Sequence, residues 1–128
     1  MPEVHFRNVD LEVTSRARLD RLVEAFPDRA YLLSQWQKQG VHHAAFEMDD
    51  RAADPEELVR VFCDLVESLP DDARQVWDAC SDRVADIGIH SGDVGNYYAS
   101  KLQPATLARL AELGIGVAVS VYPLFNDE

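Results

Sequence analysis

The clearest pattern of hydrophobic and polar positions lies in the last third of the chain, where a helical repeat precedes a strand repeat. Pro104 suits the first turn of a helix, and Gly114 suits its end because glycine readily adopts the left-handed conformation. Between them, apolar residues recur at helical spacing at Leu107, Leu110, Ala111 and Leu113. Large aliphatic residues then alternate with small ones over residues 115–122. We therefore expect a helix followed by a strand that is covered closely on both faces, as a central strand is.

The N-terminal residues predict a strand followed by a helix. Apolar residues alternate around Phe6 and again over residues 9–13, but their parity changes between the two segments. This change indicates a β-bulge, or a strand that begins near Asn8. Thr14 or Ser15 is suited to cap the helix that follows, whose apolar face contains Leu19, Leu22, Val23 and Phe26.

The middle of the chain predicts a hairpin, two helices in tandem and a further strand. Two antiparallel strands are expected between residues 30 and 48, joined by a turn at Gln37–Gly40. Asp54–Glu57 has a strong helix-start signature, with an acid at the N-cap, proline at the first helical position and a carboxylate at the third. Pro70 divides the following helical pattern in two, and a short strand is expected over residues 84–89.

The predicted order is therefore strand, helix, two strands, two helices, strand, helix, strand. This order fits an α/β sandwich of the α+β type, in which a mixed sheet of about five strands has helices packed on one face. The 128 residues contain no visible linker, repeat or low-complexity segment, so we expect one domain over residues 1–128.

Charge excludes two classes of partner. The chain has 12 Lys and Arg against 23 Asp and Glu, for a formal net charge of −11. Residues 47–86 hold thirteen of the acids and four arginines, which places −9 in this segment. Such a field repels phosphate backbones and anionic lipid, so direct binding to nucleic acid or to a membrane is not expected. A basic protein partner remains compatible with it.

The sequence indicates a cytoplasmic protein with reduced thiols. No segment approaches the roughly 20 apolar residues that a membrane span needs, and the start of the chain lacks the pattern of a signal peptide. Cys63 and Cys80 are each expected within a helix as partly buried thiols, because two cysteines alone cannot complete a zinc site.

No motif for catalysis or cofactor binding emerges. His42 and His43 are adjacent, so on a strand they point to opposite faces, and a metal site would require His5, His42 and His90 to converge across strands. The loop over residues 91–100 contains glycines but matches no phosphate-binding pattern. Neither cysteine sits at a helix N-terminus that would activate it. We therefore expect no cofactor, no metal and no enzymatic activity.

Two groups of residues are better candidates for binding a protein partner. The first is an acidic face on the tandem helices, and the second is a polar loop with consecutive tyrosines, a residue type favoured in interface cores. The candidate partner-binding residues are Glu56, Asp64, Glu67, Asp78 and Asp82 on the helices, with Asp93, Tyr97 and Tyr98 in the loop. An acidic surface of this kind mainly raises the rate of association with a basic partner.

The spacing Leu102-x-Pro104-x-x-Leu107-x-x-Leu110-Ala111-x-Leu113-Gly114-Ile115 resembles the C-terminal signature of the bacterial domain of unknown function four-two-seven-nine. The resemblance covers the last third of the chain well and the helix from Asp54 loosely. That family has no settled activity, so the resemblance implies a fold and no catalytic residue. Domains of this size and acidity are often similar to immunity proteins that neutralise toxins.

Three functional hypotheses follow from the sequence. The leading one is a non-enzymatic protein-binding domain, an immunity protein that blocks a basic toxin with its acidic helices and the 91–98 loop. The second is a structural homodimer, formed by strand pairing or by the apolar segment Val121–Phe125. The third is a small enzyme or ligand-binding domain with a pocket beside His42, His43 or His90.

Overall fold

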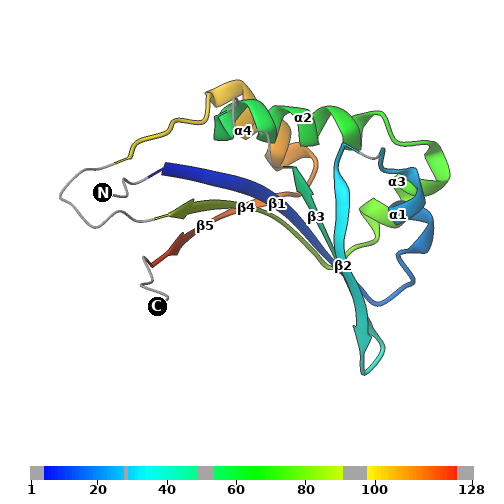
Figure 1. Cartoon of the computed structure of the whole chain (residues 1–128). Helices are drawn as coiled ribbons and strands as arrows, with labels where there is room; N and C mark the ends of the chain where they lie inside the picture. Colours follow the sequence, from blue (N-terminus) through cyan, green and yellow to red (C-terminus); the bar gives the residue numbers. More distant parts are fainter. Residues whose placement is uncertain (1–4, 28, 49–53, 91–97, 124–128) are drawn as a thin grey trace.

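In the part of the chain that the structure describes, five strands form one mixed sheet and four helices cover one of its faces (Figure 1). This computed structural model describes residues 5–27, 29–48, 54–90 and 98–123. The strands are β1 (His5–Ser15), β2 (Tyr31–Lys38), β3 (Val41–Met48), β4 (Asp82–His90) and β5 (Gly116–Tyr122). The helices are α1 (Asp20–Ala25), α2 (Pro55–Glu67), α3 (Asp71–Asp78) and α4 (Pro104–Glu112). The predicted order of elements and the predicted α+β class are confirmed.

The sheet has the spatial order β2-β3-β1-β4-β5, which places the first strand at its centre. β1 pairs antiparallel with β3 on one side and with β4 on the other, and β2 pairs antiparallel with β3 as a hairpin. β5 pairs parallel with β4, because α4 carries the chain back across the sheet between them. The register of β1 against β4 shifts between Phe6 and Asn8, so the predicted β-bulge is confirmed.

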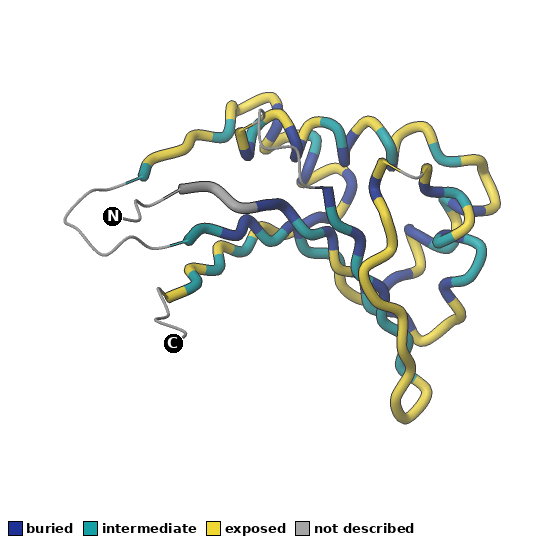
Figure 2. Tube along the Cα trace, viewed as in Figure 1, coloured by how far each residue is buried: buried dark blue, intermediate teal, exposed yellow. Residues whose placement is uncertain are grey.

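The hydrophobic core lies between the sheet and the helices. Val9, Leu11 and Val13 of β1 have at most 1% of their surface exposed, and α2 packs over this strand. Trp77 of α3 and Phe62 of α2 are among the largest fully buried side chains. Figure 2 shows buried residues along the central strands and on the sides of the helices that face them, whereas β2 is exposed at every position.

Local signals in the sequence set several element boundaries as expected. Asp54 and Glu57 form a reciprocal capping box at the start of α2, with bonds of 3.0 and 3.1 Å. The hairpin turns at Gln39 and Gly40, whose φ angles of 54° and 79° suit the tight turns that match strand twist. Gly114 has a φ of 73° and ends α4.

Two local predictions are wrong. Thr14 and Ser15 do not cap a helix, because β1 continues through both of them and α1 begins at Asp20. Ser15 instead accepts a hydrogen bond from the backbone N–H of Ala17 at 3.0 Å, which stabilises the bend that follows the strand. A serine or threonine hydroxyl can bond to a nearby backbone N–H both in a helix cap and in a turn. The residue type alone therefore does not distinguish a cap from a turn.

The expectation that β5 is a central strand is also wrong. β5 lies at the edge of the sheet, and Val117, Val119 and Val121 are 44%, 59% and 60% exposed. Alternation of large and small residues reports that a segment pairs into a sheet, but it carries no information about where in the sheet the strand lies.

Candidate functional site

The acidic residues of the tandem helices are largely paired with arginines. Arg109 of α4 contacts Asp64 and Glu67 of α2 at 2.5 and 2.7 Å, and Arg74 contacts Asp78 within α3 at 3.0 Å. Hydrogen bonding to Arg109 holds the pKa of Glu67 below its usual value. The arginines therefore neutralise acids that the sequence analysis expected to bind a partner protein. The argument for a binding surface on the helices is therefore weaker than the sequence suggests.

Glu56 joins two helices instead of facing a partner. Its side chain is only 13% exposed, and its carboxylate accepts hydrogen bonds from the backbone N–H of Gln103 at 2.9 Å and from the hydroxyl of Thr106 at 2.7 Å. Arg60 lies 3.3 Å away on the next turn of α2. Glu56 thus connects the start of α2 to the start of α4, and its role is structural.

The remaining predicted site residues do not extend the acidic face of the helices. Asp82 is the first residue of β4 and not part of a helix, which corrects its predicted position. Asp93 and Tyr97 lie outside the described residues. Tyr98 is half-buried, and burial raises the pKa of its hydroxyl. The six predicted residues that the structure describes are divided among α2, α3, β4 and the segment before α4.

A different group of acids lies on the face of the sheet that the helices leave uncovered. Since Val9, Leu11 and Val13 point into the core, the alternate residues of β1 point to the opposite face, and their register partners share it. We call this surface the open face. It contains Asn8, Asp10, Glu12 and Thr14 of β1, Tyr31, Ser34, Trp36 and Lys38 of β2, Val41, His43, Ala45 and Glu47 of β3, Asp82, Val84, Asp86, Gly88 and His90 of β4, and Gly116, Ala118, Ser120 and Tyr122 of β5. Asp82 is thus the one predicted site residue among those described that lies on this face.

Three carboxylates form a row across the middle of the open face. Asp10 lies opposite Glu47 of β3 on one side and opposite Asp86 of β4 on the other. Glu12 is two residues along β1 on the same face. Among the described residues, no lysine or arginine forms an ion pair with any of these four acids. The row therefore differs from the helix surface, because its charges are uncompensated.

The outer two carboxylates of the row are held in place by hydrogen bonds. Glu47 accepts hydrogen bonds from the amide of Asn8 and from the hydroxyl of Tyr31, the latter at 2.7 Å. Asp86 accepts a hydrogen bond of 2.8 Å from the hydroxyl of Ser120 on β5. The Oδ1 atom of Asp10, between them, is buried and has no hydrogen-bond partner. The two outer carboxylates are thus held in position, whereas one oxygen of the central carboxylate lacks a hydrogen bond.

Crowding of these acids changes their protonation. Burial, followed by the charges of Glu47, Glu12 and Asp86, raises the pKa of Asp10 from 3.8 to about 7. Burial and the charges of Asp86 and Asp82 also raise the pKa of Glu12. Both shifts have the direction expected where carboxylates approach one another without a cation.

An aromatic hollow borders the carboxylate row. Trp36 and His43 stack with their ring centroids 3.9 Å apart and their planes 13° from parallel. These two rings line a hollow of about 240 Å³ on the open face. Its other lining residues are Glu12, Val13, Thr14, Ser34, Ala44 and Ala45. The Nδ1 atom of His43 lies 3.3 Å from the hydroxyl of Thr14. Trp36 is 51% exposed, so one large aromatic surface remains accessible beside a carboxylate.

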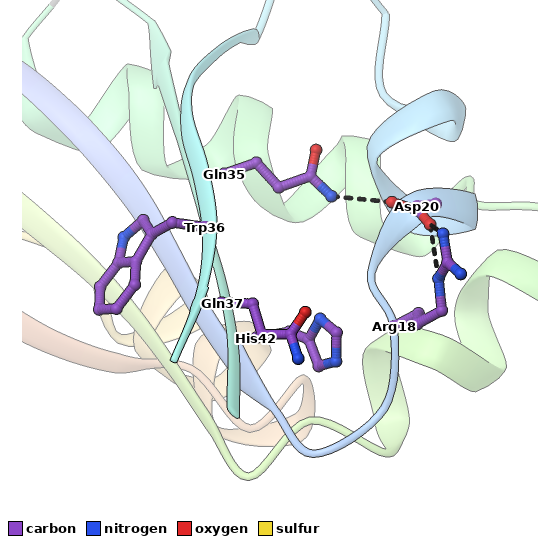
Figure 3. A pocket seen from close by; sticks show the side chains of 6 residues that line it. All are labelled: Arg18, Asp20, Gln35, Trp36, Gln37 and His42. Carbon is purple, nitrogen blue, oxygen red and sulfur yellow. Dashed lines mark hydrogen bonds and ion pairs between the residues drawn. The ribbon is translucent and has the colours of Figure 1, made fainter. Parts of the chain in front are cut away.

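A second hollow lies on the helix side, between the start of α1 and the β2-β3 hairpin (Figure 3). It measures about 520 Å³ and is lined by Arg18, Asp20, Gln35, Trp36, Gln37 and His42. Arg18 and Gln35 both donate hydrogen bonds to Asp20, at 2.8 and 2.9 Å. Figure 3 shows that the Trp36 side chain points away from this group. Arg18, Asp20 and Gln35 thus bond to one another within this hollow.

His42, His43 and His90 do not converge. His42 lies on the helix side of β3, His43 lies on the open face, and each of the two hollows described above contains one of them. His90 lies at the end of β4, opposite Tyr122 with ring centroids 6.1 Å apart, and His5 is its register partner on β1. Among the residues that the structure describes, no group of three His, Cys, Asp or Glu side chains is placed to hold a metal ion. Hollows do lie beside His42 and His43, with one histidine in each, so a ligand-binding pocket beside a histidine stays a prediction.

The cysteines are buried thiols, as expected, although Cys80 follows α3 instead of lying within it. Burial raises the pKa of both thiols, that of Cys63 to about 11. They are protonated near neutral pH and are poor nucleophiles.

Comparison of the chain with protein-family models, with curated protein sequences and with solved structures found no match. The resemblance to the domain of unknown function four-two-seven-nine therefore stays a prediction. Every described helix is too short or too polar to cross a lipid bilayer.

Sequence reasoning missed Asp10, Glu12, Glu47 and Asp86 as a group. A signal for the first two was present, because polar residues alternate with Val9, Leu11 and Val13 along β1. Glu47 and Asp86 join them only through the pairing of β1 with β3 and β4. That pairing links residues far apart in the chain, and no local pattern encodes it.

Proposed function

We propose that this protein is a non-enzymatic binding domain that takes up a basic protein partner on the open face of its sheet. The observation that carries the proposal is the row Glu47, Asp10 and Asp86, three carboxylates on adjacent strands without a cationic partner among the described residues. Carboxylates that repel one another are stabilised when a lysine or arginine from a partner is placed between them.

The aromatic hollow suits one such side chain. A guanidinium can stack on the exposed ring of Trp36 and at the same time pair with Glu12, which lines the same hollow. Arginine is favoured over lysine at such a site, because its planar group bonds to a carboxylate through two N–H donors. The hollow supplies an anchoring point, and the carboxylate row supplies the surrounding field.

The proposed class of function is the one that the sequence suggests, but the proposed binding surface is the open face of the sheet and not the acidic face of the helices. A net charge of −11 attracts a basic partner over a distance and raises its association rate, as suits an immunity protein that must capture a toxin in the cytoplasm. The helix surface has a similar number of acids, but Arg109 and Arg74 already neutralise Asp64, Glu67 and Asp78. The open face is therefore the better candidate for the contact itself.

Binding of a fluorescein-labelled oligo-arginine peptide, followed by fluorescence anisotropy, tests the proposal. The open-face variant carries Asp10→Asn, Glu47→Gln and Asp86→Asn. The matched control carries Asp64→Asn, Glu67→Gln and Asp78→Asn. Binding is measured at about pH 8, where Asp10 is mostly ionised, so both variants lose about three negative charges. We expect the open-face variant to bind the peptide at least about tenfold more weakly than the wild type, and the control to change affinity by less than about threefold.

Circular dichroism and thermal unfolding establish that both variants keep the fold. Equal loss of affinity in the two variants would mean that the peptide senses net charge alone, and this would refute a site on the open face. Trp36→Ala gives an independent readout, since it removes the stacking surface without changing charge. Unchanged affinity in Trp36→Ala would exclude the hollow as the anchoring point, and unchanged affinity in the open-face variant would overturn the proposal as a whole.

A further inference from the structure

The outer edge of β5 has the properties of an interface. β5 is the last strand of the sheet, and no described strand lies along its outer side. Val117, Val119 and Val121 share the face on which the helices lie, yet no helix covers them and they are 44% to 60% exposed. An edge strand with an apolar stripe is a template for pairing with another strand.

The edge lacks the features that usually prevent such pairing. Edge strands in natural proteins are commonly protected by charged residues, by proline or by a bulge. Residues 113–126 contain no Asp, Glu, Lys or Arg, and proline first occurs at Pro123, after β5 has ended. The β4-β5 register runs from Val84 and Gly116 to His90 and Tyr122 without a shift.

The opposite edge of the sheet is protected. The register of β2 against β3 shifts between Leu32 and Ser34, which marks a bulge around Leu33. β2 also ends in a charged residue, Lys38, and its hairpin twists away beyond the other strands (Figure 1). The contrast between the two edges indicates that the regular, uncharged edge of β5 is the one suited to pairing.

The sequence of β5 is complementary to itself in the antiparallel direction. Val119 is the central residue of the seven in Gly116–Tyr122. A two-fold axis through Val119 places Val117 of one copy opposite Val121 of the other, and all seven residues of each strand find a partner. The six valines then form one stripe on a single face, where β-branched cross-strand pairs are favourable.

We propose that two copies of this chain associate through antiparallel pairing of their β5 strands, which joins the two sheets into one. Because the edge of β5 carries no charged side chain, two copies can meet there without bringing like charges into contact. Elsewhere the chain repels its own copies through a net charge of −11, but this edge is neutral and meets only the same neutral edge. The inference stands independently of the partner proposed for the open face.

Sedimentation velocity of the full chain, over a range of concentrations, tests the dimer. The test variant is Val119→Lys, which places two like charges at the two-fold axis. The matched control is Leu33→Lys on the other edge, a residue that is 49% exposed and receives the same charge. We expect a concentration-dependent dimer for the wild type and the control, and a monomer for Val119→Lys with its circular dichroism spectrum unchanged.

Three results would overturn the inference. The first is a wild-type chain that stays monomeric at the highest accessible concentration, which would also be the outcome if another segment of the same chain covered the valines. The second is a dimer that survives Val119→Lys, and the third is a dimer that is lost in Leu33→Lys. Binding of the oligo-arginine peptide by the Val119→Lys monomer separates this interface from the open face, because the two surfaces are distinct.

Discussion

Asp10 of β1 lies directly opposite Glu47 of β3, so two carboxylates face each other at the centre of the sheet. Asp86 adds a third on the other side of Asp10. Like charges directly opposite one another destabilise a sheet, and the fold tolerates them here because Asp10 holds its proton up to about pH 7. Local arrangements that cost stability are found more often at binding sites, and this one is the basis of the proposed function.

The stability of the protein should fall as pH rises from acid to neutral. The pKa of Asp10 is 3.8 unfolded and about 7 folded, so its contribution is fully present below about pH 4 and is lost as pH rises through 7. Because Asp10 keeps some solvent exposure, we expect a loss of about 1–2 kcal/mol between about pH 5 and about pH 8. Chemical denaturation at the two pH values measures it.

Asp10→Asn should remove most of this dependence. The amide cannot ionise, so the variant is expected to be more stable than the wild type at about pH 8 and similar to it at about pH 5. Glu24→Gln on α1 serves as an exposed control with the same charge change. A variant whose unfolding free energy follows the wild-type pH profile would show that Asp10 is not the titrating group.

Glu56→Ala should weaken the contact between α2 and α4 and lower the free energy of unfolding. The carboxylate accepts hydrogen bonds from Gln103 and Thr106, and Thr106 is buried, so truncation leaves polar groups without partners. We expect a loss of about 1–3 kcal/mol in the free energy of unfolding by denaturant. Glu112→Ala, at the exposed end of α4, should change stability by less than about 0.5 kcal/mol. Equal effects would argue against the structural role of Glu56.

Gly88→Ala should destabilise the sheet where Gly116→Ala does not. A Cβ at Gly88 would lie 2.5 Å from Oδ1 of Asn8 and 3.2 Å from Cε2 of Tyr122. At Gly116 the nearest atom is the carbonyl oxygen of Arg83, at 3.8 Å, which is an ordinary contact. We expect a loss of about 1–3 kcal/mol for the first variant, because the buried Asn8 side chain, which is hydrogen-bonded to Glu47, must move, and little change for the second. Thermal unfolding compares them.

Arg83→Lys should loosen the junction between α3 and the turn after α4. The guanidinium donates hydrogen bonds to the carbonyl oxygens of Trp77, Asp78, Cys80 and Gly114, at 2.9 to 3.2 Å. A lysine ammonium cannot reach all four carbonyls, so we expect a loss of about 1–3 kcal/mol. Arg16→Lys, in the exposed bend after β1, is the control. The free energy of unfolding should be unchanged in that variant.

Local patterns were sufficient for most of the fold. The capping box at Asp54, the break at Pro70 and the left-handed end of α4 at Gly114 depend on neighbouring residues alone, and the structure confirms all three. The error at Thr14 and Ser15 has the same origin, since a hydroxyl suits a turn as well as a cap. For the candidate site, spacing on α2 placed Asp64 and Glu67 on one face correctly but could not reveal Arg109 across from them.

The sequence by itself determined the number, type and order of the elements, because helix caps, turns and hydrophobic periodicity are interactions within a few residues. Tertiary structure alone decided which charges are compensated and which strands lie at the edges. Arg109 neutralises two acids from another helix, while Glu47, Asp10 and Asp86 meet without a cation. The neutralised acids of the helices and the unpaired acids of the sheet both result from contacts between elements that are distant in the chain. The electrostatic energy of each charge depends on whether such a contact places an opposite or a like charge beside it.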